Sequence, residues 1–297
     1  MERSEIYIDA FKAHLIDKRQ ASGNTVSSYV RDIAQFLDFC EKDSLTDIVE
    51  DDIRSYLSWL GEKGRAPATT ARVVASLKAF FGHFTSNAVI SINPVAGISI
   101  SGFSRELPQI LTGAEIAHLL EQPNASSLKG LRDRAMLETL YATGIRVSEL
   151  IALDEPDINL ATNLITCRSG KERTIPVYRD AVNALGEYIN SARPQMLASN
   201  EESALFVNRG GVRMTRQGFW KIVKSYTEKA KITKAITPQT LRHSFAAHLL
   251  ENGADIKILQ EMLGHTNIAS TQIYAKIVKK QLKDEYFRSH PRSVRDR

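Results

Sequence analysis

The stretch TPQTLRHSFAAHLLENGADIKILQEMLGHTNIASTQIYA, residues 237–275, decides how the second half of this chain is interpreted. Apolar residues recur in it at helical spacing, and Gly253 and Gly264 end two predicted helices. The stretch also holds His265 and Tyr274, nine positions apart. Tyr274 is either a half-buried packing aromatic near the end of the chain or a nucleophile that the fold presents.

The composition is that of an ordinary globular protein. The chain has 297 residues, enough for two domains, with 43% hydrophobic and 25% charged residues. No apolar run reaches the ~18 residues of a membrane span, and the N-terminus lacks a signal-peptide pattern, so we expect a cytoplasmic protein that does not enter a membrane. Cys40 and Cys167 lack metal-ligand spacing, which predicts buried thiols rather than a disulfide framework or a zinc site.

Positive charge is concentrated in the second half of the chain. Residues 163–297 hold 23 Lys and Arg against 12 Asp and Glu, whereas residues 1–162 hold 16 against 22. Such a basic half is typical of a protein that binds nucleic acid, although a solvated surface is the alternative. The candidate phosphate contacts surround a Gly-Gly loop and a helix start. They are Arg209, Arg213, Arg216, Lys221 and Lys224.

The periodicity predicts two domains. Four or five short helices fill the first hundred residues, and a stretch rich in Ser, Gly and Pro follows them. We therefore expect a helical domain at 1–98, a linker at 99–109 and a second domain at 110–297. The second domain is predicted to be mostly helical, with a β-hairpin over 163–178 whose second strand lies at an edge because of Pro176. The predicted fold is mainly α with a small β-sheet in the C-terminal domain.

Several kinds of catalytic site have no signature in this sequence. It shows no acidic cluster for magnesium, no glycine-rich phosphate loop and no nucleophile elbow, which disfavours a metal- or nucleotide-dependent mechanism; we expect no cofactor. Five cationic or polar residues instead lie at ends and turns of predicted elements. They are Arg146, Lys171, Arg242, His265 and Tyr274.

These five residue types can handle a phosphodiester without a metal. Two guanidiniums, Arg146 and Arg242, can hold the non-bridging oxygens and stay charged. They can also stabilise the phenolate of Tyr274 for attack, while Lys171 can protonate the leaving oxygen and His265 can donate or carry a proton. Each also has a plain structural alternative, such as an ion pair between an arginine and Glu149 or a solvated lysine in a turn.

Four motifs together resemble the tyrosine recombinase (phage integrase) family and its Xer-type members. They are ATGIRVSEL (142–150), SGKERTIPV (169–177), TPQTLRHSFAAHLLENGAD (237–255) and LGHTNIASTQIY (263–274). The resemblance implies a helical-bundle DNA-binding domain followed by a catalytic domain, with the catalytic positions on the five residues named above.

One position departs from the pattern of the family. Gln239 stands three residues before Arg242, where the family usually has histidine. Glutamine can hydrogen-bond but cannot carry a proton at neutral pH, so we expect slow catalysis if that histidine is a general base. His243 lies one residue past Arg242, which turns its side chain by roughly 100° on a helix, so we expect His243 and His248 to be structural.

The resemblance also implies a reaction and an assembly. Duplex DNA would be cleaved and rejoined at specific sites through a 3′-phosphotyrosine bond, without metal or ATP. A homo- or hetero-tetramer would form on DNA through the C-terminal tail, with a second recombinase and a septal DNA translocase as possible partners, in the resolution of chromosome dimers. In the tail, Ile277, Leu282, Tyr286 and Phe287 would dock on a neighbouring subunit or pack on their own domain.

The sequence leaves three other functions open. A phage or transposon integrase of the same family is one. A DNA-binding protein in which Gln239 marks weakened catalysis is another. A type IB topoisomerase-like enzyme shares the nucleophile chemistry but relaxes supercoils in a single duplex.

Overall fold

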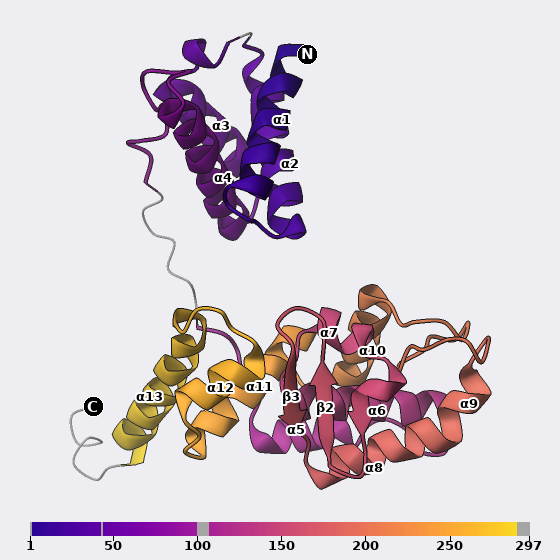
Figure 1. Cartoon of the computed structure of the whole chain (residues 1–297). Coiled ribbons are helices and arrows are strands. Elements are labelled where there is room, and N and C mark those ends of the chain that lie inside the picture. Colours follow the sequence, from indigo (N-terminus) through magenta and orange to yellow (C-terminus); the bar gives the residue numbers. More distant parts are fainter. Residues whose placement is uncertain (1, 43, 100–106, 290–297) are drawn as a thin grey trace. The chain divides into compact units, whose positions relative to one another are not determined.

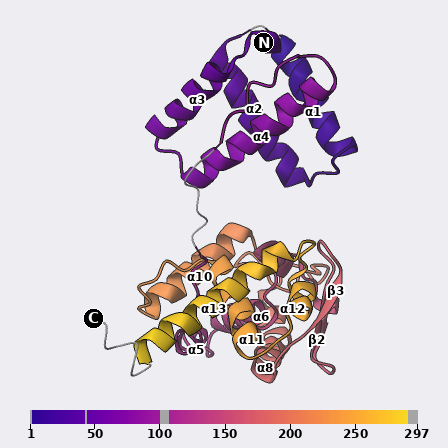
Figure 2. The same ribbon diagram turned by 90° about the vertical axis from the view of Figure 1, so that its left-hand side faces the viewer.

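A computed structural model describes residues 2–42, 44–99 and 107–289, and the side chains of residues 5–42, 44–99 and 107–279. The chain forms two compact units, Met1–Arg105 and Glu106–Arg297, each with its own hydrophobic core (Figures 1 and 2). Residues 100–106 of the predicted linker and 290–297 of the predicted tail lie outside the described residues. Among the described helices, none combines the length and the apolar character that crossing a membrane requires.

The N-terminal unit is helical, as its periodicity predicts. Pro67 occupies the first turn of its last helix, where a missing N–H costs nothing. Its core is rich in aromatic rings, and Phe11 and Phe80 meet edge to face with ring centroids 5.3 Å apart. The elements are α1 (Glu2–Asp17), α2 (Gly23–Cys40), the 3₁₀ helix η1 (Leu45–Asp47), α3 (Glu50–Glu62) and α4 (Pro67–Ser86).

The C-terminal unit combines helices with a small antiparallel sheet, which confirms the predicted fold class. Its first elements are α5 (Gly113–Leu120), α6 (Leu128–Thr143), α7 (Val147–Ala152), the 3₁₀ helix η2 (Glu155–Asp157), β1 (Ile158–Asn159), β2 (Leu164–Cys167), β3 (Arg173–Pro176) and α8 (Arg179–Glu187). The π-helix η3 (Tyr188–Ala192), α9 (Arg193–Met196), α10 (Arg216–Lys229), α11 (Pro238–Glu251), α12 (Ile256–Leu263) and α13 (Ala269–Ser289) follow.

The sheet has the strand order β1-β2-β3, with Ile165 of β2 paired to Ile175 of β3. Strand β3 lies at an edge, as Pro176 predicts, because proline cannot donate to a further strand. The two-residue strand β1 has no counterpart in the sequence-based prediction. Its two residues are too few to leave a period-2 pattern.

Two glycines end helices next to the functional residues. Gly144 follows α6 with φ +59°, and Gly264 follows α12 with φ +63°, a left-handed conformation that favours glycine. Space is a second constraint at Gly144, since a Cβ there would lie 2.2 Å from the ring of Phe245 on α11. Helix α11 packs against α6, α12 and α13, so these turns bring segments that are distant in sequence to one place (Figure 1).

Candidate active site

Arg146 lies at the N-cap of α7, directly after the turn that Gly144 makes. Its backbone N–H donates to Glu149 Oε2 at 2.6 Å and its Nη1 donates to Glu149 Oε1 at 3.2 Å. The side chain of Arg146 is 44% exposed, so its guanidinium can still reach a ligand from solvent. The ion pair that sequence offered as the structural alternative for Arg146 therefore exists, and it orients the arginine without enclosing it.

Glu149 is the buried carboxylate around which the cations are arranged. It also accepts from both terminal nitrogens of Arg173, and Arg242 Nη1 lies 4.0 Å from it. Burial favours the neutral carboxyl, but hydrogen bonds from Arg173 and Arg146 outweigh it and lower the pKa of Glu149. Arg173 was not predicted as a site residue; its nearness to Lys171 in SGKERTIPV was the only signal for it.

Arg242 is buried on α11, with 1% of its surface exposed. It donates to the carbonyl of Gly144, to the carbonyl of Leu263 at 2.8 Å and to Nε2 of His265 at 2.8 Å. Burial first, and then the charge of Arg146, lower the pKa of Arg242 to about 10. The guanidinium therefore remains protonated at neutral pH.

His265 follows the Gly264 turn, as the sequence predicts, and its partners define its tautomer. Because a guanidinium only donates, Nε2 accepts from Arg242 and the proton lies on Nδ1, which donates to Thr271 Oγ1 at 2.9 Å. Burial, followed by the charge of Arg242, lowers the pKa of His265 to about 4. The imidazole is thus neutral at physiological pH.

Tyr274 lies on α13 and is 2% exposed, packed among apolar residues that include Phe245, Leu259 and Leu263. Its hydroxyl is 2.9 Å from Nδ1 of His243. Burial raises the pKa of Tyr274, while Arg242 and then Arg146 act in the opposite direction. Tyr274 is therefore a buried packing aromatic, and its hydroxyl also lies where a nucleophile would be placed.

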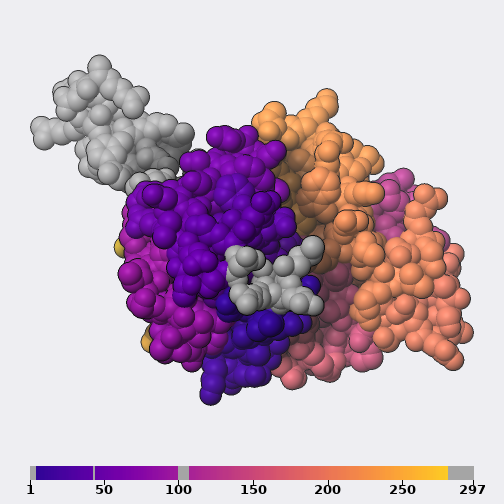
Figure 3. Space-filling model, turned by 90° about the horizontal axis from the view of Figure 1, so that it is seen from above, coloured from indigo at the N-terminus to yellow at the C-terminus, as the bar shows by residue number. Residues whose placement is uncertain are grey.

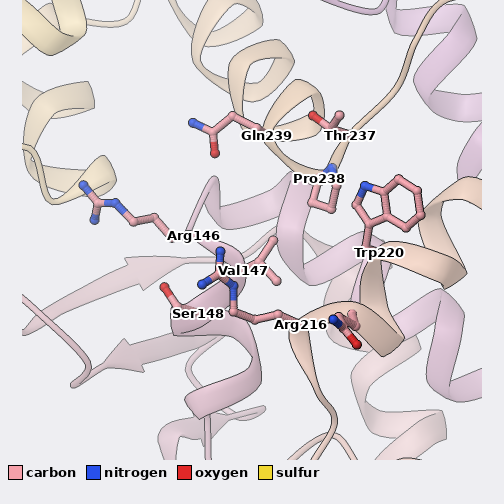
Figure 4. Close-up of a pocket in the computed structure, with 9 residues that line it drawn as sticks. Arg146, Val147, Ser148, Arg216, Trp220, Thr237, Pro238 and Gln239 are labelled. Carbon is pink, nitrogen blue, oxygen red and sulfur yellow. The ribbon is translucent and has the colours of Figure 1, made fainter. Parts of the chain in front are cut away.

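A cavity of about 660 Å³ opens beside Arg146. Gln239, at the start of α11, lines the same cavity, and so do Arg216 and Trp220 from α10 (Figure 4). Trp220 is 47% exposed and was not predicted as a site residue, since a lone aromatic on an amphipathic helix resembles a core residue. The cavity offers two guanidiniums, the amides of Gln239 and Gln217, and an aromatic face to a ligand.

Lys171 is the predicted catalytic residue that the structure leaves apart from the others. It is exposed in the β2–β3 turn after Gly170, whose φ is +84°. Only its carbonyl contacts the cluster, accepting from Arg173 at 3.1 Å. A proton donor on this turn would have to reach its substrate from the rim of the site.

Among the predicted DNA contacts, Arg213 differs from the rest. Its guanidinium donates to Asp154 Oδ1 at 2.5 Å and to the carbonyls of Ile151 and Leu153, so it ties the end of α7 to the loop before α10. The other four cations are exposed. They are Arg209, Arg216, Lys221 and Lys224. Their segment, residues 209–224, falls in the orange part of the colour bar in Figure 3.

The two histidines predicted to be structural behave differently. His248 joins elements, with Nε2 donating to the Leu111 carbonyl at 2.8 Å and Nδ1 lying 2.8 Å from the Tyr141 hydroxyl. His243 instead contacts the hydroxyl of Tyr274, a relationship that no sequence spacing indicates.

Two family models match most of this chain. The model of the phage integrase family matches residues 109–281, and the model of the phage integrase N-terminal SAM-like domain matches residues 8–86. A tyrosine recombinase XerD of Oceanobacillus iheyensis is 43% identical over 296 residues, covering 97% of this chain and 99% of that protein. A tyrosine recombinase XerC of Herpetosiphon aurantiacus is 42% identical, covering 91% of this chain and 90% of that one.

Solved structures share the fold. The crystal structure of XerA recombinase is 29% identical, covers 96% of this chain and 98% of that chain, and has a TM-score of 0.54. A XerH recombinase bound to palindromic difH substrate, in a post-cleavage complex, is 22% identical with a TM-score of 0.73, covering 91% and 81% of the two chains. The chain belongs to the phage integrase family, the tyrosine recombinases, and its relatives at 42–43% identity are Xer-type members.

Proposed function

We propose that this chain is an Xer-type site-specific recombinase that cleaves and rejoins duplex DNA through a 3′-phosphotyrosine intermediate. The observation that carries the proposal is the position of the Tyr274 hydroxyl, beside the positive charges of Arg242 and Arg146 and 2.9 Å from His243. A structural tyrosine needs no cations around its oxygen. A nucleophilic one does, because phenolate and the phosphorane-like transition state are both anionic.

In this mechanism Arg146 and Arg242 bind the non-bridging oxygens of the scissile phosphate. His265 would add a third polar contact to the phosphate once its proton moves from Nδ1 to Nε2, because in this structure Nδ1 donates to Thr271 and Nε2 accepts from Arg242. Attack by Tyr274 conserves the energy of the phosphodiester in the protein–DNA bond. Ligation by an incoming 5′ hydroxyl then needs neither ATP nor metal, and Lys171 supplies the proton that the departing 5′ oxygen requires.

The two predicted domains, 1–98 and 110–297, would hold the duplex on opposite faces, joined by the linker at 99–109. Arg216, which lines the cavity, would contact a phosphate there, and the exposed Arg209, Lys221 and Lys224 would contact further phosphates. Arg213, whose guanidinium is held by Asp154 and two carbonyls, is the weakest of the proposed contacts.

A tetramer on DNA, assembled through the C-terminal tail, completes the proposal, with a second copy or a second recombinase as the neighbour. We place this chain in the cytoplasm, where a septal DNA translocase would be a further partner. Ile277 is 5% exposed in the core that contains Tyr274, so this residue packs on its own domain. The docking segment then begins after it.

Covalent trapping tests the proposal directly. A duplex that the protein selects from a random pool is nicked near the cleavage position, so that the short product diffuses away and the adduct accumulates. The wild-type chain should form the adduct and Tyr274→Phe should bind the duplex without forming it. Tyr188→Phe is the matched control, because this buried hydroxyl donates to the Leu205 carbonyl away from the cluster.

Other outcomes decide between the alternatives. Binding without any adduct from the wild-type chain would indicate a DNA-binding protein with weakened catalysis. Relaxation of plasmids that lack the selected sequence would indicate a topoisomerase-like enzyme instead. Recombination between two selected sites on one plasmid is the result that supports the proposal.

A further inference from the structure

His243 and Gln239 lie on the same side of α11, so His243 faces the same region as the position where the family usually has histidine. They are four residues apart, and four residues on a helix turn by about 400°, one full turn plus roughly 40°. Gln239 is exposed at the rim of the cavity, and it forms no side-chain hydrogen bond with any described residue. His243 is half-buried one turn deeper, where it meets the tyrosine oxygen.

We propose that His243 accepts the proton of Tyr274 as the phenol attacks the phosphate. This step rests on the proposed function. The distance of 2.9 Å from Nδ1 to the hydroxyl oxygen is that of a direct hydrogen bond, and the two rings are tilted by 49° with centroids 5.5 Å apart. With its proton on Nε2, the imidazole presents a lone pair to the phenol at the geometry that proton transfer requires.

The step balances without a further reactant. The Tyr274 oxygen forms its bond to phosphorus as its proton passes to Nδ1 of His243. The bond from phosphorus to the 5′ oxygen breaks, and this oxygen leaves with a proton from Lys171. In ligation the imidazolium returns its proton to the tyrosine oxygen, while the attacking 5′ hydroxyl gives its proton to the lysine.

The charges around His243 favour this role once DNA is bound. Burial and then the charge of Arg242 lower the pKa of His243 to about 4, so the imidazole is neutral and its lone pair is available. Arg146 and Arg242 are the charged groups facing the reacting oxygen, on α7 and α11. A phosphate anion bound between them offsets their charge, which raises the basicity of His243 in the complex where it is needed.

Adduct formation by the full-length chain on the nicked selected duplex, at saturating protein concentration, tests the assignment. His243→Asn keeps a group that can hydrogen-bond to Tyr274 but cannot take its proton, and His243→Ala removes the contact. Both variants should bind DNA and cleave about 10²–10⁴-fold more slowly near neutral pH. The deficit relative to the wild type should shrink as the pH rises above neutral, because hydroxide then removes the phenol proton increasingly without help. Loss of charge at Arg242, whose pKa is lowered to about 10, affects the wild type and the variants alike.

A second substrate separates this role from that of the proton donor. Sulfur in place of the bridging 5′ oxygen makes a leaving group that needs no proton. Lys171→Ala should therefore recover on the sulfur substrate, whereas His243→Asn should remain slow. His248→Asn is the matched control, because His248 also lies on α11 and contacts a tyrosine hydroxyl, that of Tyr141. This variant should cleave at the wild-type rate.

Three results would overturn the assignment. A His243→Asn variant that cleaves within a few-fold of the wild type would reduce His243 to a positioning contact. A deficit that is equal at every pH would mean a structural role. Failure of the wild-type chain to form any adduct would overturn the proposed function and this step together, and it is thereby distinguished from the first two results.

Discussion

Each carboxylate oxygen of Glu149 accepts a hydrogen bond from a different terminal nitrogen of Arg173, and both distances are 3.1 Å. The same carboxylate also accepts from Nη1 of Arg146 at 3.2 Å and lies 4.0 Å from Arg242. One buried negative charge thus offsets part of the repulsion among three guanidiniums. The cluster keeps its cations in place before any phosphate arrives.

Glu149→Gln should therefore damage both folding and catalysis. Removing one member of a buried ion pair typically costs about 3–5 kcal/mol, because the remaining charge loses its partner. We expect the free energy of unfolding, measured in urea, to fall by an amount of that order, and adduct formation to fall with it. Glu228→Gln is the control, since the exposed pair of Glu228 with Lys224 at 4.0 Å should contribute less than about 1 kcal/mol. Equal losses for the two variants would contradict the role of Glu149.

Acid should weaken the C-terminal unit through its two neutral histidines. The folded-state pKa values of His243 and His265 are about 4, against an ordinary value of 6.5, so the unfolded chain binds protons first as the pH falls. Their stability contribution is complete above pH 6.5 and is lost as the pH falls toward 4. His14 and His83 of the N-terminal unit, whose pKa values are also lowered, act in the same direction.

Urea denaturation at pH 7.5 and pH 5 measures this dependence. Comparing the wild type with a His243→Asn, His265→Asn double variant removes the contribution of the N-terminal histidines, because both proteins retain it. The double variant should lose less stability than the wild type between the two pH values. An unchanged loss would mean that other groups cause the acid sensitivity.

Restoring the histidine typical of the family should have an effect that depends on His243. Gln239→His should raise the rate of adduct formation only modestly in the wild-type background, where His243 already accepts the proton. The same change in the His243→Asn background should raise the rate of adduct formation at least about 10-fold, because a base within reach contributes about 10²–10⁴-fold to the rate. Equal factors in both backgrounds, in single-turnover assays, would show that positions 239 and 243 act independently.

Deletion from Lys279 onward should separate assembly from binding. The truncation keeps Tyr274 and Ile277 in their core, so binding to one half-site should change little in mobility-shift titrations. Pairing of two duplexes should weaken much more, since the proposed docking segment is gone. Equal loss of both activities would count against docking on a neighbouring subunit.

The fold class followed from local signals in this sequence. The helix periods and the hairpin over 163–178 with its edge proline have the predicted form in the structure. Such signals are readable because they depend on residues within one turn or one hairpin. The four motifs also indicated which arginines, histidine and tyrosine to consider, since family resemblance resides in short segments.

Long-range contacts were decided only by tertiary structure. Sequence offered Glu149 merely as an alternative partner, and it did not identify Arg173 or Trp220, because ion pairs and cavity walls join segments that no local pattern connects. The sequence also predicted a structural role for His243, from the angle between its side chain and that of Arg242 on a helix. The packing of α13 on α11 instead determines that His243 contacts Tyr274. A helix fixes the direction of a side chain relative to its own axis, but only the neighbouring helix determines which atom lies there.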